Sequence, residues 1–165
     1  MTDEGWVECV VALGTNQGDR EDIAFRALSD LRATEGFRVV SASSLYETVA
    51  LGPEGPKPEA PGYLNQVIVM KTAWSAAKTL DALMRIEREH GRTREGVKFA
   101  DRTLDLDLIV YGEVVSDDPH LTIPHPRAHE RRFVLQPWLE ISPLASIPGK
   151  GPIRELLESL PADTP

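Results

Sequence analysis

The chain has 165 residues, of which 41% are hydrophobic and 27% are charged. This length fits one domain, and the composition excludes disordered, collagen-like and low-complexity classes. No stretch approaches the roughly 18 apolar residues of a membrane-spanning helix, and the first residues are acidic where a signal peptide is basic. We therefore expect a single cytoplasmic domain over residues 1–165 with no membrane partner.

The charge balance and the cysteine count restrict the function further. The 26 acidic residues outnumber the 18 basic ones and give a net charge of −8, which disfavours binding to nucleic acid or to an anionic membrane. Cys9 is the single cysteine, so neither an internal disulfide nor a structural zinc site is expected. Basic residues nevertheless gather in segments 85–102 and 127–132. They indicate a compact anionic ligand held together with a metal.

Apolar patterning predicts the elements of the first third of the chain. Residues 7–13 form an apolar, β-branched run that predicts a buried strand. Asp19 is placed to cap the helix that follows, whose apolar residues recur at helical spacing until near Gly36. Residues 37–46 predict a second strand. The four prolines and three glycines of residues 52–62 predict a long loop.

The next segments complete a recognisable order of elements. Residues 63–72 predict a third strand, and residues 75–90 predict an amphipathic helix. Residues 104–111 alternate and then become apolar, which predicts a strand that residues 112–115 could extend into a hairpin. The resulting order βαββαβ is that of ferredoxin-like, split α+β domains. We expect helices on one face of the sheet and additional C-terminal elements, among them a short helix over 153–160.

The segment RTLDLDLIV, residues 102–110, carries the clearest chemical signal. Side chains alternate along a strand, so Asp105 and Asp107 share one face with their Cα atoms about 6.6–6.8 Å apart. Two carboxylates at this spacing, completed by water and phosphate oxygens, suit Mg²⁺, and paired metal ions can clamp a phosphoryl group. The alternative is a solvated strand face, but aspartate is disfavoured in strands. We therefore predict a metal site here.

Two basic loops flank these aspartates in the sequence. Their cationic or hydrogen-bonding residues are Arg92, Arg94, Lys98 and Arg102 before the pair, and His125, Arg127, His129, Arg131 and Arg132 after it. Arginine matches phosphate oxygens, and a neutral imidazole can donate one more hydrogen bond. Each cluster alone also fits a charged surface turn. Together with the carboxylates, the two loops resemble a metal–polyphosphate site.

A second type of ligand is indicated on the third predicted strand. Tyr63 and Asn65 share a strand face, where a ring and an amide can hold a flat heterocycle by stacking and edge hydrogen bonds; a core tyrosine and a turn asparagine are the alternative. GTNQG after the first strand is neither a Walker loop nor a Rossmann turn. No Gly-x-Ser-x-Gly motif is present, and Cys9 lies in an apolar run, so nucleophilic acyl transfer is poorly supported.

Five segments together carry a resemblance to a known family. They are VALGTNQGDR (11–20), SSLYETVALGP (43–53), YLNQVIVM (63–70), KFADRTLDLDLIVYG (98–112) and LTIPHPRAHERRFVLQPWLEISP (121–143). In this order they closely resemble the 6-hydroxymethyl-7,8-dihydropterin pyrophosphokinases. These folate-pathway enzymes move a diphosphate from ATP to a pterin alcohol and release AMP. The resemblance extends over about residues 7–143, and its Arg-x-x-Asp-Leu-Asp signature is specific.

The resemblance implies a role for individual residues. Asp105 and Asp107 are implied to hold two Mg²⁺ ions and, with Arg92 and Arg102, to form the catalytic set. The implied ATP-binding residues are Glu87, Arg92, Arg94, Arg102, Leu108, Thr122, His125 and Arg131. The implied pterin-binding residues are Tyr63 and Phe133 on the two faces of the ring, with Asn65 and the backbone around Thr48 and Leu51 at its edge. The implied partners are the pterin and ATP, without nucleic acid, and we expect a monomer.

The sequence departs from the family pattern in a few places. Ala100 and Asp101 stand where small residues such as Gly-Pro are usual, while Phe99 and Val49 replace a frequent tryptophan and proline. Asp101 would add a negative charge near ATP. Residues 52–62 and 91–100 flank the predicted site, and we expect both loops to order when ATP and pterin bind.

Two other classes of function remain as alternatives. One is a ferredoxin-like binding module, either a ligand sensor or a single-strand RNA binder, although an acidic chain with 6% aromatic residues is a poor RNA binder. The other is a two-metal nuclease. Release of AMP from ATP in the presence of pterin separates the pyrophosphokinase from both.

Overall fold

The computed structural model describes residues 5–16, 18–49, 51–52, 55–56, 62–91 and 104–165. Its main strands are β1 (Val7–Thr15), β2 (Phe37–Ala42), β3 (Tyr46–Thr48), β6 (Tyr63–Thr72) and β7 (Asp105–Tyr111). Its α-helices are α1 (Arg20–Ala33), α2 (Ala76–Gly91), α3 (Arg132–Ile141) and α4 (Ile153–Glu158). The short elements are β4 (Leu51–Gly52), β5 (Gly55–Pro56), β8 (Ser116–Asp118), β9 (Leu121–Ile123), η1 (Ala128–Glu130), β10 (Ser146–Ile147) and β11 (Gly151–Pro152).

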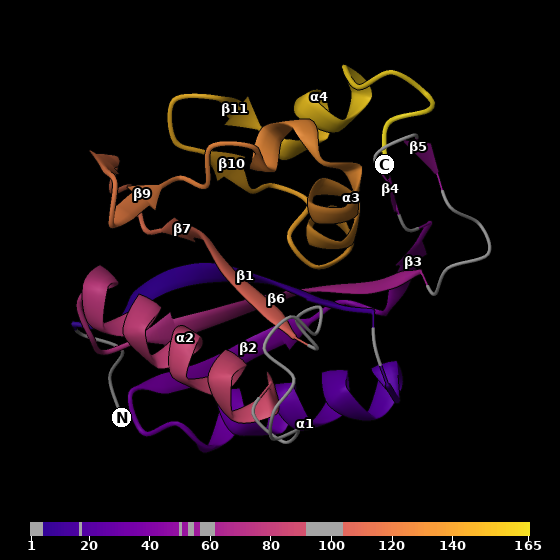
Figure 1. Cartoon of the computed structure of the whole chain (residues 1–165). Helices are drawn as coiled ribbons and strands as arrows, with labels where there is room; N and C mark the ends of the chain where they lie inside the picture. Colours follow the sequence, from indigo (N-terminus) through magenta and orange to yellow (C-terminus); the bar gives the residue numbers. More distant parts are fainter. Residues whose placement is uncertain (1–4, 17, 50, 53–54, 57–61, 92–103) are drawn as a thin grey trace.

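One antiparallel sheet organises these elements. Its strands run in the order β2-β6-β1-β7, and β3 pairs with the first residues of β6, from Tyr63 to Asn65. Helix α1 connects β1 to β2, and α2 connects β6 to β7 (Figure 1). This topology confirms the predicted βαββαβ order and the α+β class.

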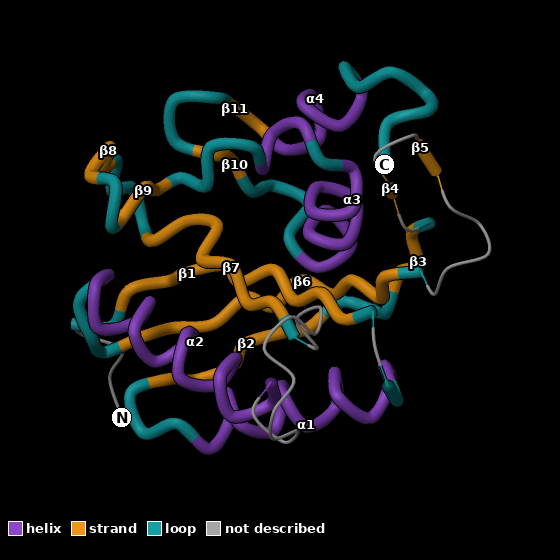
Figure 2. Tube along the Cα trace, in the orientation of Figure 1, coloured by secondary structure: helices purple, strands orange, loops and turns teal. Residues whose placement is uncertain are grey.

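The sheet is covered on both faces. Figure 2 shows α1 and α2 against one face and α3 against the other, with α4 packed on α3 beyond it. Side chains alternate along β6, so Ile68 and Met70 pack towards α1 and α2 while Val67 and Val69 pack towards α3. All four side chains are at most 4% exposed, and each contributes about 1.5–3 kcal/mol by leaving water. The predicted helices occupy one face, and the additional C-terminal elements close the opposite face.

The local signals for helix α1 are confirmed. Asp19 is the N-cap, and its side chain accepts a hydrogen bond from the backbone N of Asp22 at 3.2 Å. The helix ends at Ala33, three residues before Gly36, near which the end was predicted, and Thr34 is its C-cap. Burial of Ala24, Ala27 and Leu31 fixes which side of the helix faces the sheet.

Two sequence predictions need correction. The strand predicted over residues 37–46 is two strands, because Ser43 leaves the ladder and exchanges hydrogen bonds with the backbone of Val67 through its N and Oγ. The hairpin predicted at residues 112–115 is wrong. The N of Gly112 donates to the carbonyl of Glu8 at 2.8 Å, and the hairpin that follows pairs β8 with β9.

Other predictions fall on parts of the chain outside the described ranges. The loop predicted at residues 52–62 is described only at four of its positions, where β4 and β5 pair through Gly52 and Gly55. Of the loop predicted at residues 91–100, the structure describes position 91 alone. The prediction that both loops become ordered on ligand binding therefore also falls on residues outside the described ranges. Within the described chain, no helix combines the length and apolar character needed to cross a membrane.

Candidate active site

A pocket of about 350 Å³ lies between one end of the sheet and the start of α3. Seven of the residues predicted from the sequence line it: Thr48, Tyr63, Asn65, Asp105, Asp107, Arg131 and Phe133. They come from β3, β6, β7 and the α3 region, so tertiary structure gathers residues up to 85 positions apart. The pocket joins a carboxylate pair to an aromatic and amide surface.

The carboxylate pair has the arrangement predicted by strand alternation. Asp105 and Asp107 are half-buried and line the pocket, while Leu106 and Leu108 are buried in the core on the other face. Among the described residues, no group of three or more His, Cys, Asp or Glu side chains could hold a metal. Two carboxylates facing one pocket fit Mg²⁺, which retains water and takes phosphate oxygens as ligands. The donor set therefore fits the predicted ion, and it does not form a closed protein cage.

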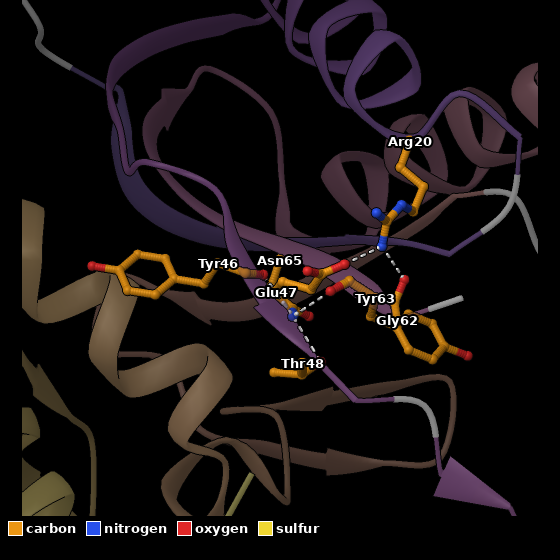
Figure 3. Close-up of polar contacts among 7 residues, drawn as sticks. All are labelled: Arg20, Tyr46, Glu47, Thr48, Gly62, Tyr63 and Asn65. Carbon is orange, nitrogen blue, oxygen red and sulfur yellow. Dashed lines mark hydrogen bonds and ion pairs between the residues drawn. The ribbon is translucent and has the colours of Figure 1, made fainter. Parts of the chain in front are cut away.

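The amide of Asn65 is oriented by β3. Its Nδ2 group donates to the carbonyl of Tyr46 at 3.1 Å and to Oγ1 of Thr48 at 3.0 Å (Figure 3). The two hydrogens of Nδ2 are thus directed to two protein acceptors. The carbonyl oxygen Oδ1 is the other polar atom of this side chain, and it can accept hydrogen bonds from N–H groups.

Arg131 and Phe133 bring a cation and a ring to the other wall of the pocket. The guanidinium carbon of Arg131 lies 5.4 Å from the centroid of the Phe133 ring, within the range of a cation–π contact. Both residues lie at the start of α3, and both line the pocket. A positive charge and an aromatic ring therefore lie side by side on this wall of the pocket.

His125 lies close to the carboxylate pair without lining the pocket. Its backbone N donates to the carbonyl of Ile109 at 2.8 Å, which holds this segment against β7. Its Nδ1 accepts from the backbone N of Arg127 at 3.2 Å, so the neutral ring carries its proton on Nε2. Burial lowers the pKa of His125; Asp107 opposes this shift, whereas Arg131 and Arg127 add to it. The ring is therefore a neutral hydrogen-bond donor near neutral pH.

Besides His125, three predicted ATP-binding residues lie outside this pocket. Glu87 on α2 accepts a hydrogen bond from the backbone N of Leu106 at 2.8 Å and so helps to fix β7. Leu108 is 5% exposed and packs in the core. Thr122 is exposed on β9, and its hydroxyl donates to the carbonyl of Asp118 at 3.0 Å.

The remaining predicted residues are described in part or not at all. Arg92, Arg94 and Arg102 lie outside the described residues. At Leu51 the structure describes the backbone, which pairs with Pro56 in the small β4-β5 sheet. Val49, where the family often has proline, is described and lines the pocket.

Sequence reasoning missed part of the pocket wall. The additional lining residues are Ala12, Leu13, Gly14, Val134 and Pro165. Pro165 is brought there by Arg132, whose backbone N donates to its carbonyl at 2.7 Å and whose guanidinium donates to the carbonyls of Thr164 and Pro161. No sequence signal marks this contact. Gly14 did carry a signal, since glycine inside a strand often marks a close approach of a ligand.

Cys9 is not part of the site. It is 0% exposed, and burial raises the pKa of its thiol to about 12. The thiol therefore stays protonated at neutral pH and is a poor nucleophile, as the sequence predicted.

Comparison with known proteins places the chain in a family. The family model described as 7,8-dihydro-6-hydroxymethylpterin-pyrophosphokinase (HPPK) matches residues 10–143. A 2-amino-4-hydroxy-6-hydroxymethyldihydropteridine pyrophosphokinase of Haemophilus influenzae is 36% identical over 152 residues, which are 92% of each chain. The protein of the same name from Bacillus subtilis is 38% identical over 79% of this chain and 75% of its own.

A solved structure gives the same fold. The crystal structure of Plasmodium falciparum HPPK-DHPS with pterin and p-hydrobenzoate superposes with a TM-score of 0.68 at 14% identity. The match covers 93% of this chain and 44% of that one, so this chain spans less than half of the longer protein. Sequence and fold agree, and the chain belongs to the 7,8-dihydro-6-hydroxymethylpterin-pyrophosphokinase family.

Proposed function

We propose that this chain transfers the diphosphate of ATP to the hydroxymethyl oxygen of 6-hydroxymethyl-7,8-dihydropterin and releases AMP, a step of folate biosynthesis. Family membership supports the reaction class, and the names of the relatives give the pterin acceptor. One observation carries the proposal furthest: a single pocket places Asp105 and Asp107 beside Tyr63, Asn65 and Phe133. The carboxylates proposed to bind the metal–phosphate group and the side chains proposed to bind the pterin therefore line the same pocket.

The pterin would lie between Tyr63 and Phe133, which both line the pocket. Stacking of a base on an aromatic side chain is worth about 1–3 kcal/mol. Oδ1 of Asn65 would accept a hydrogen bond from an N–H group at the pterin edge, because Nδ2 already donates to Tyr46 and Thr48. The backbone around Thr48 and Leu51 would complete the contacts to this edge.

The polyphosphate would lie towards β7 and the start of α3. Asp105 and Asp107 would hold two Mg²⁺ ions, which, when bound, neutralise phosphate charge and lower the pKa of the attacking alcohol. Arg131 would contact the phosphate oxygens, and the Nε2–H of His125 is a further donor close to Asp107. Arg92, Arg94 and Arg102 remain proposed ATP ligands on the basis of the family resemblance, as do Glu87, Leu108 and Thr122.

The residues of the pocket would act mainly by positioning and by electrostatics. The hydroxymethyl oxygen forms a bond to the β-phosphorus and gives up its proton to solvent, while the bond between that phosphorus and the bridging oxygen breaks and AMP leaves with that oxygen. Tyr63, Asn65 and Phe133 hold the acceptor still, and Arg131 stabilises negative charge on the transferred group. A monomeric state and a cytoplasmic location are further expectations for this chain.

The test is the identity of the nucleotide product. The purified chain is incubated with ATP, Mg²⁺ and 6-hydroxymethyl-7,8-dihydropterin, and the nucleotides are separated and quantified. We expect AMP in a one-to-one ratio with pterin diphosphate, and no AMP without pterin. ADP as the product would contradict diphosphate transfer. Pterin binding without any nucleotide product would favour a ferredoxin-like sensor.

A further inference from the structure

Arg20, the first residue of α1, joins two segments that carry the pterin-binding side chains. Its Nη1 lies 2.6 Å from Oε2 of Glu47 and 2.6 Å from the carbonyl oxygen of Gly62 (Figure 3). An Nη group carries two hydrogens, so one nitrogen can donate to both acceptors. The guanidinium therefore connects β3 with the residue immediately before β6.

Both acceptors lie next to residues of the proposed pterin site. Glu47 stands between Tyr46 and Thr48, which orient the amide of Asn65. Gly62 directly precedes Tyr63, and Tyr63 is the ladder partner of Thr48. A displacement of either segment would thus move the ring of Tyr63, the groups that accept hydrogen bonds from the Asn65 amide, or both.

The junction between these segments is close-packed. A Cβ atom built on Gly62 would lie 2.4 Å from the carbonyl oxygen of Thr48, so the backbones approach too closely for any other residue. Among the described residues, the ladder between β3 and β6 has three pairs: Tyr46 with Asn65, Glu47 with Leu64, and Thr48 with Tyr63. Such a short ladder needs further support at its end, and Arg20 supplies it from another element.

Strand β3 is also held from its opposite face. The hydroxyl of Tyr46 donates to Glu140 on α3 at 2.6 Å, whereas Glu47 contacts Arg20 on α1. Neighbouring side chains on a strand point to opposite faces, which explains how the two helices hold one strand from both sides. The Arg20 contact is partly exposed, at 28% for Arg20 and 59% for Glu47, so it adds little to global stability.

We propose that Arg20 is a positioning residue for the pterin: through Glu47 and Gly62 it sets the spacing between Thr48 and Tyr63 and the orientation of Asn65. The inference rests on the proposed function, because it takes these residues as the pterin site. It assigns Arg20 no contact with the substrate and no part in phosphate binding. Its loss should therefore affect pterin binding selectively.

The experiment compares pterin and nucleotide affinity in matched variants. The dissociation constant of 6-hydroxymethyl-7,8-dihydropterin is measured by calorimetry with α,β-methylene-ATP present, and that of the nucleotide analogue is measured separately. We expect Arg20→Ala to weaken pterin binding about tenfold, equivalent to ~1.4 kcal/mol. The nucleotide constant should stay within about twofold, and Tm should fall by no more than about 2–4 °C. In turnover assays the KM for pterin should rise while kcat is largely kept.

Two further variants test the route of the effect. Glu47→Ala removes one of the two contacts, so it should weaken pterin binding less than Arg20→Ala does. The double variant should match Arg20→Ala, because Glu47 acts through Arg20. Arg26→Ala is the control: Arg26 lies on the same helix, is 69% exposed and pairs with Asp22 at 2.8 Å, away from β3. It should change neither affinity.

Asn65→Ala separates failure of this inference from failure of the proposed site. If Asn65→Ala weakens pterin binding and Arg20→Ala does not, the positioning role is wrong and the site stands. If neither variant changes pterin affinity, both the site and the positioning role are wrong. If Arg20→Ala weakens the nucleotide as much as the pterin and lowers Tm sharply, Arg20 has a general structural role and the proposal is overturned.

Discussion

Asn65 and Asp105 are both ladder partners of Gly14, from opposite sides of strand β1. Paired residues in an antiparallel sheet share a face, so the amide and the carboxylate point into the same pocket from strands two spacings apart, about 9–10 Å. Gly14 lies between them and has no side chain. The sheet itself thus sets the distance between the proposed pterin edge and the proposed metal ligands, and Gly14 leaves the space between them open.

This relationship makes Gly14 a position where stability and activity should change in opposite directions. A Cβ atom there would lie 3.8 Å from Oδ1 of Asn65, an ordinary contact, and alanine in a strand is more stable than glycine by roughly 0.5–1 kcal/mol. Gly14→Ala should therefore keep or raise Tm. Gly14→Val adds methyl groups to the pocket and should raise the KM for pterin by about tenfold or more. Thermal melts and steady-state kinetics on both variants check this, and an unchanged KM in Gly14→Val would place the pterin elsewhere.

The sequence predicts best where a local pattern decides the structure. Alternation was enough to place Asp105 and Asp107 on one face, because Leu106 and Leu108 pack into the core from the opposite face of β7. The bounds of β6 match the predicted residues 63–72, since its central run, residues 67–70, is apolar and buried on both faces of the sheet. In both cases neighbours in sequence carry the information.

The sequence predicts the structure poorly where a contact with a residue far away in the chain determines it. Ser43 ends β2 because it bonds to Val67, 24 residues away, and a serine inside a β-branched run gives no sign of this. The orientation of the Asn65 amide depends on Tyr46 and Thr48 across the ladder. Pro165 reaches the pocket with its main-chain oxygen bonded to the backbone N of Arg132, 33 residues earlier in the chain. Each of these requires a tertiary contact that no periodicity encodes.

The aspartate pair gives the most direct test of the proposed metal site. Asp105→Ala or Asp107→Ala should lower kcat by about 10²–10³ or more, the scale of losing one preorganised electrostatic group. Tm should change little, because both side chains are only half-buried and lie outside the two core clusters. The double variant should be little worse than either single variant, since the two carboxylates act as one unit.

A matched control for the pair is available on the hairpin that follows. Asp117 is exposed on β8 and does not line the pocket, so Asp117→Ala should leave kcat unchanged. Magnesium titration of turnover for each variant supplies a second measurement. Wild-type activity and metal dependence in both single variants would rule out the assignment of Asp105 and Asp107 as ligands.

The two rings should matter for the pterin and not for ATP. Tyr63→Ala or Phe133→Ala should weaken pterin binding by about 1–3 kcal/mol, the scale of stacking on an aromatic side chain. Phe133→Leu should be milder, because it keeps apolar area without the π-face. Binding constants for pterin and for a nucleotide analogue measure the difference. Phe25→Ala, which changes a ring that is 70% exposed on α1, serves as control. A selective loss of nucleotide affinity would contradict the assignment.

Glu140 links α3 to the segment that leads into β3. Its carboxylate accepts hydrogen bonds from the Tyr46 hydroxyl at 2.6 Å, from Oγ of Ser44 at 2.7 Å and from the Ser44 backbone N at 2.9 Å. The hydrogen bonds from Tyr46 and Ser44 lower the pKa of Glu140. The hydrogen bond between Tyr46 and Glu140 is also the largest cause of the raised pKa of Tyr46. The folded state therefore favours the ionised carboxylate at this position.

The pH dependence of stability should reveal this contact. Because the folded-state pKa of Glu140 is lowered, its contribution to stability is fully present above the unfolded value of about 4.3. It is lost as pH falls through the lower folded-state value. Glu140→Gln should thus be less stable than the wild type at pH 6–7, and the difference should shrink towards pH 3. Urea unfolding at a series of pH values measures this. Glu158→Gln, at an exposed position on α4, is the control and should show no such convergence. A stability difference between wild type and Glu140→Gln that stays constant with pH would show that the carboxylate charge is not what holds β3 to α3.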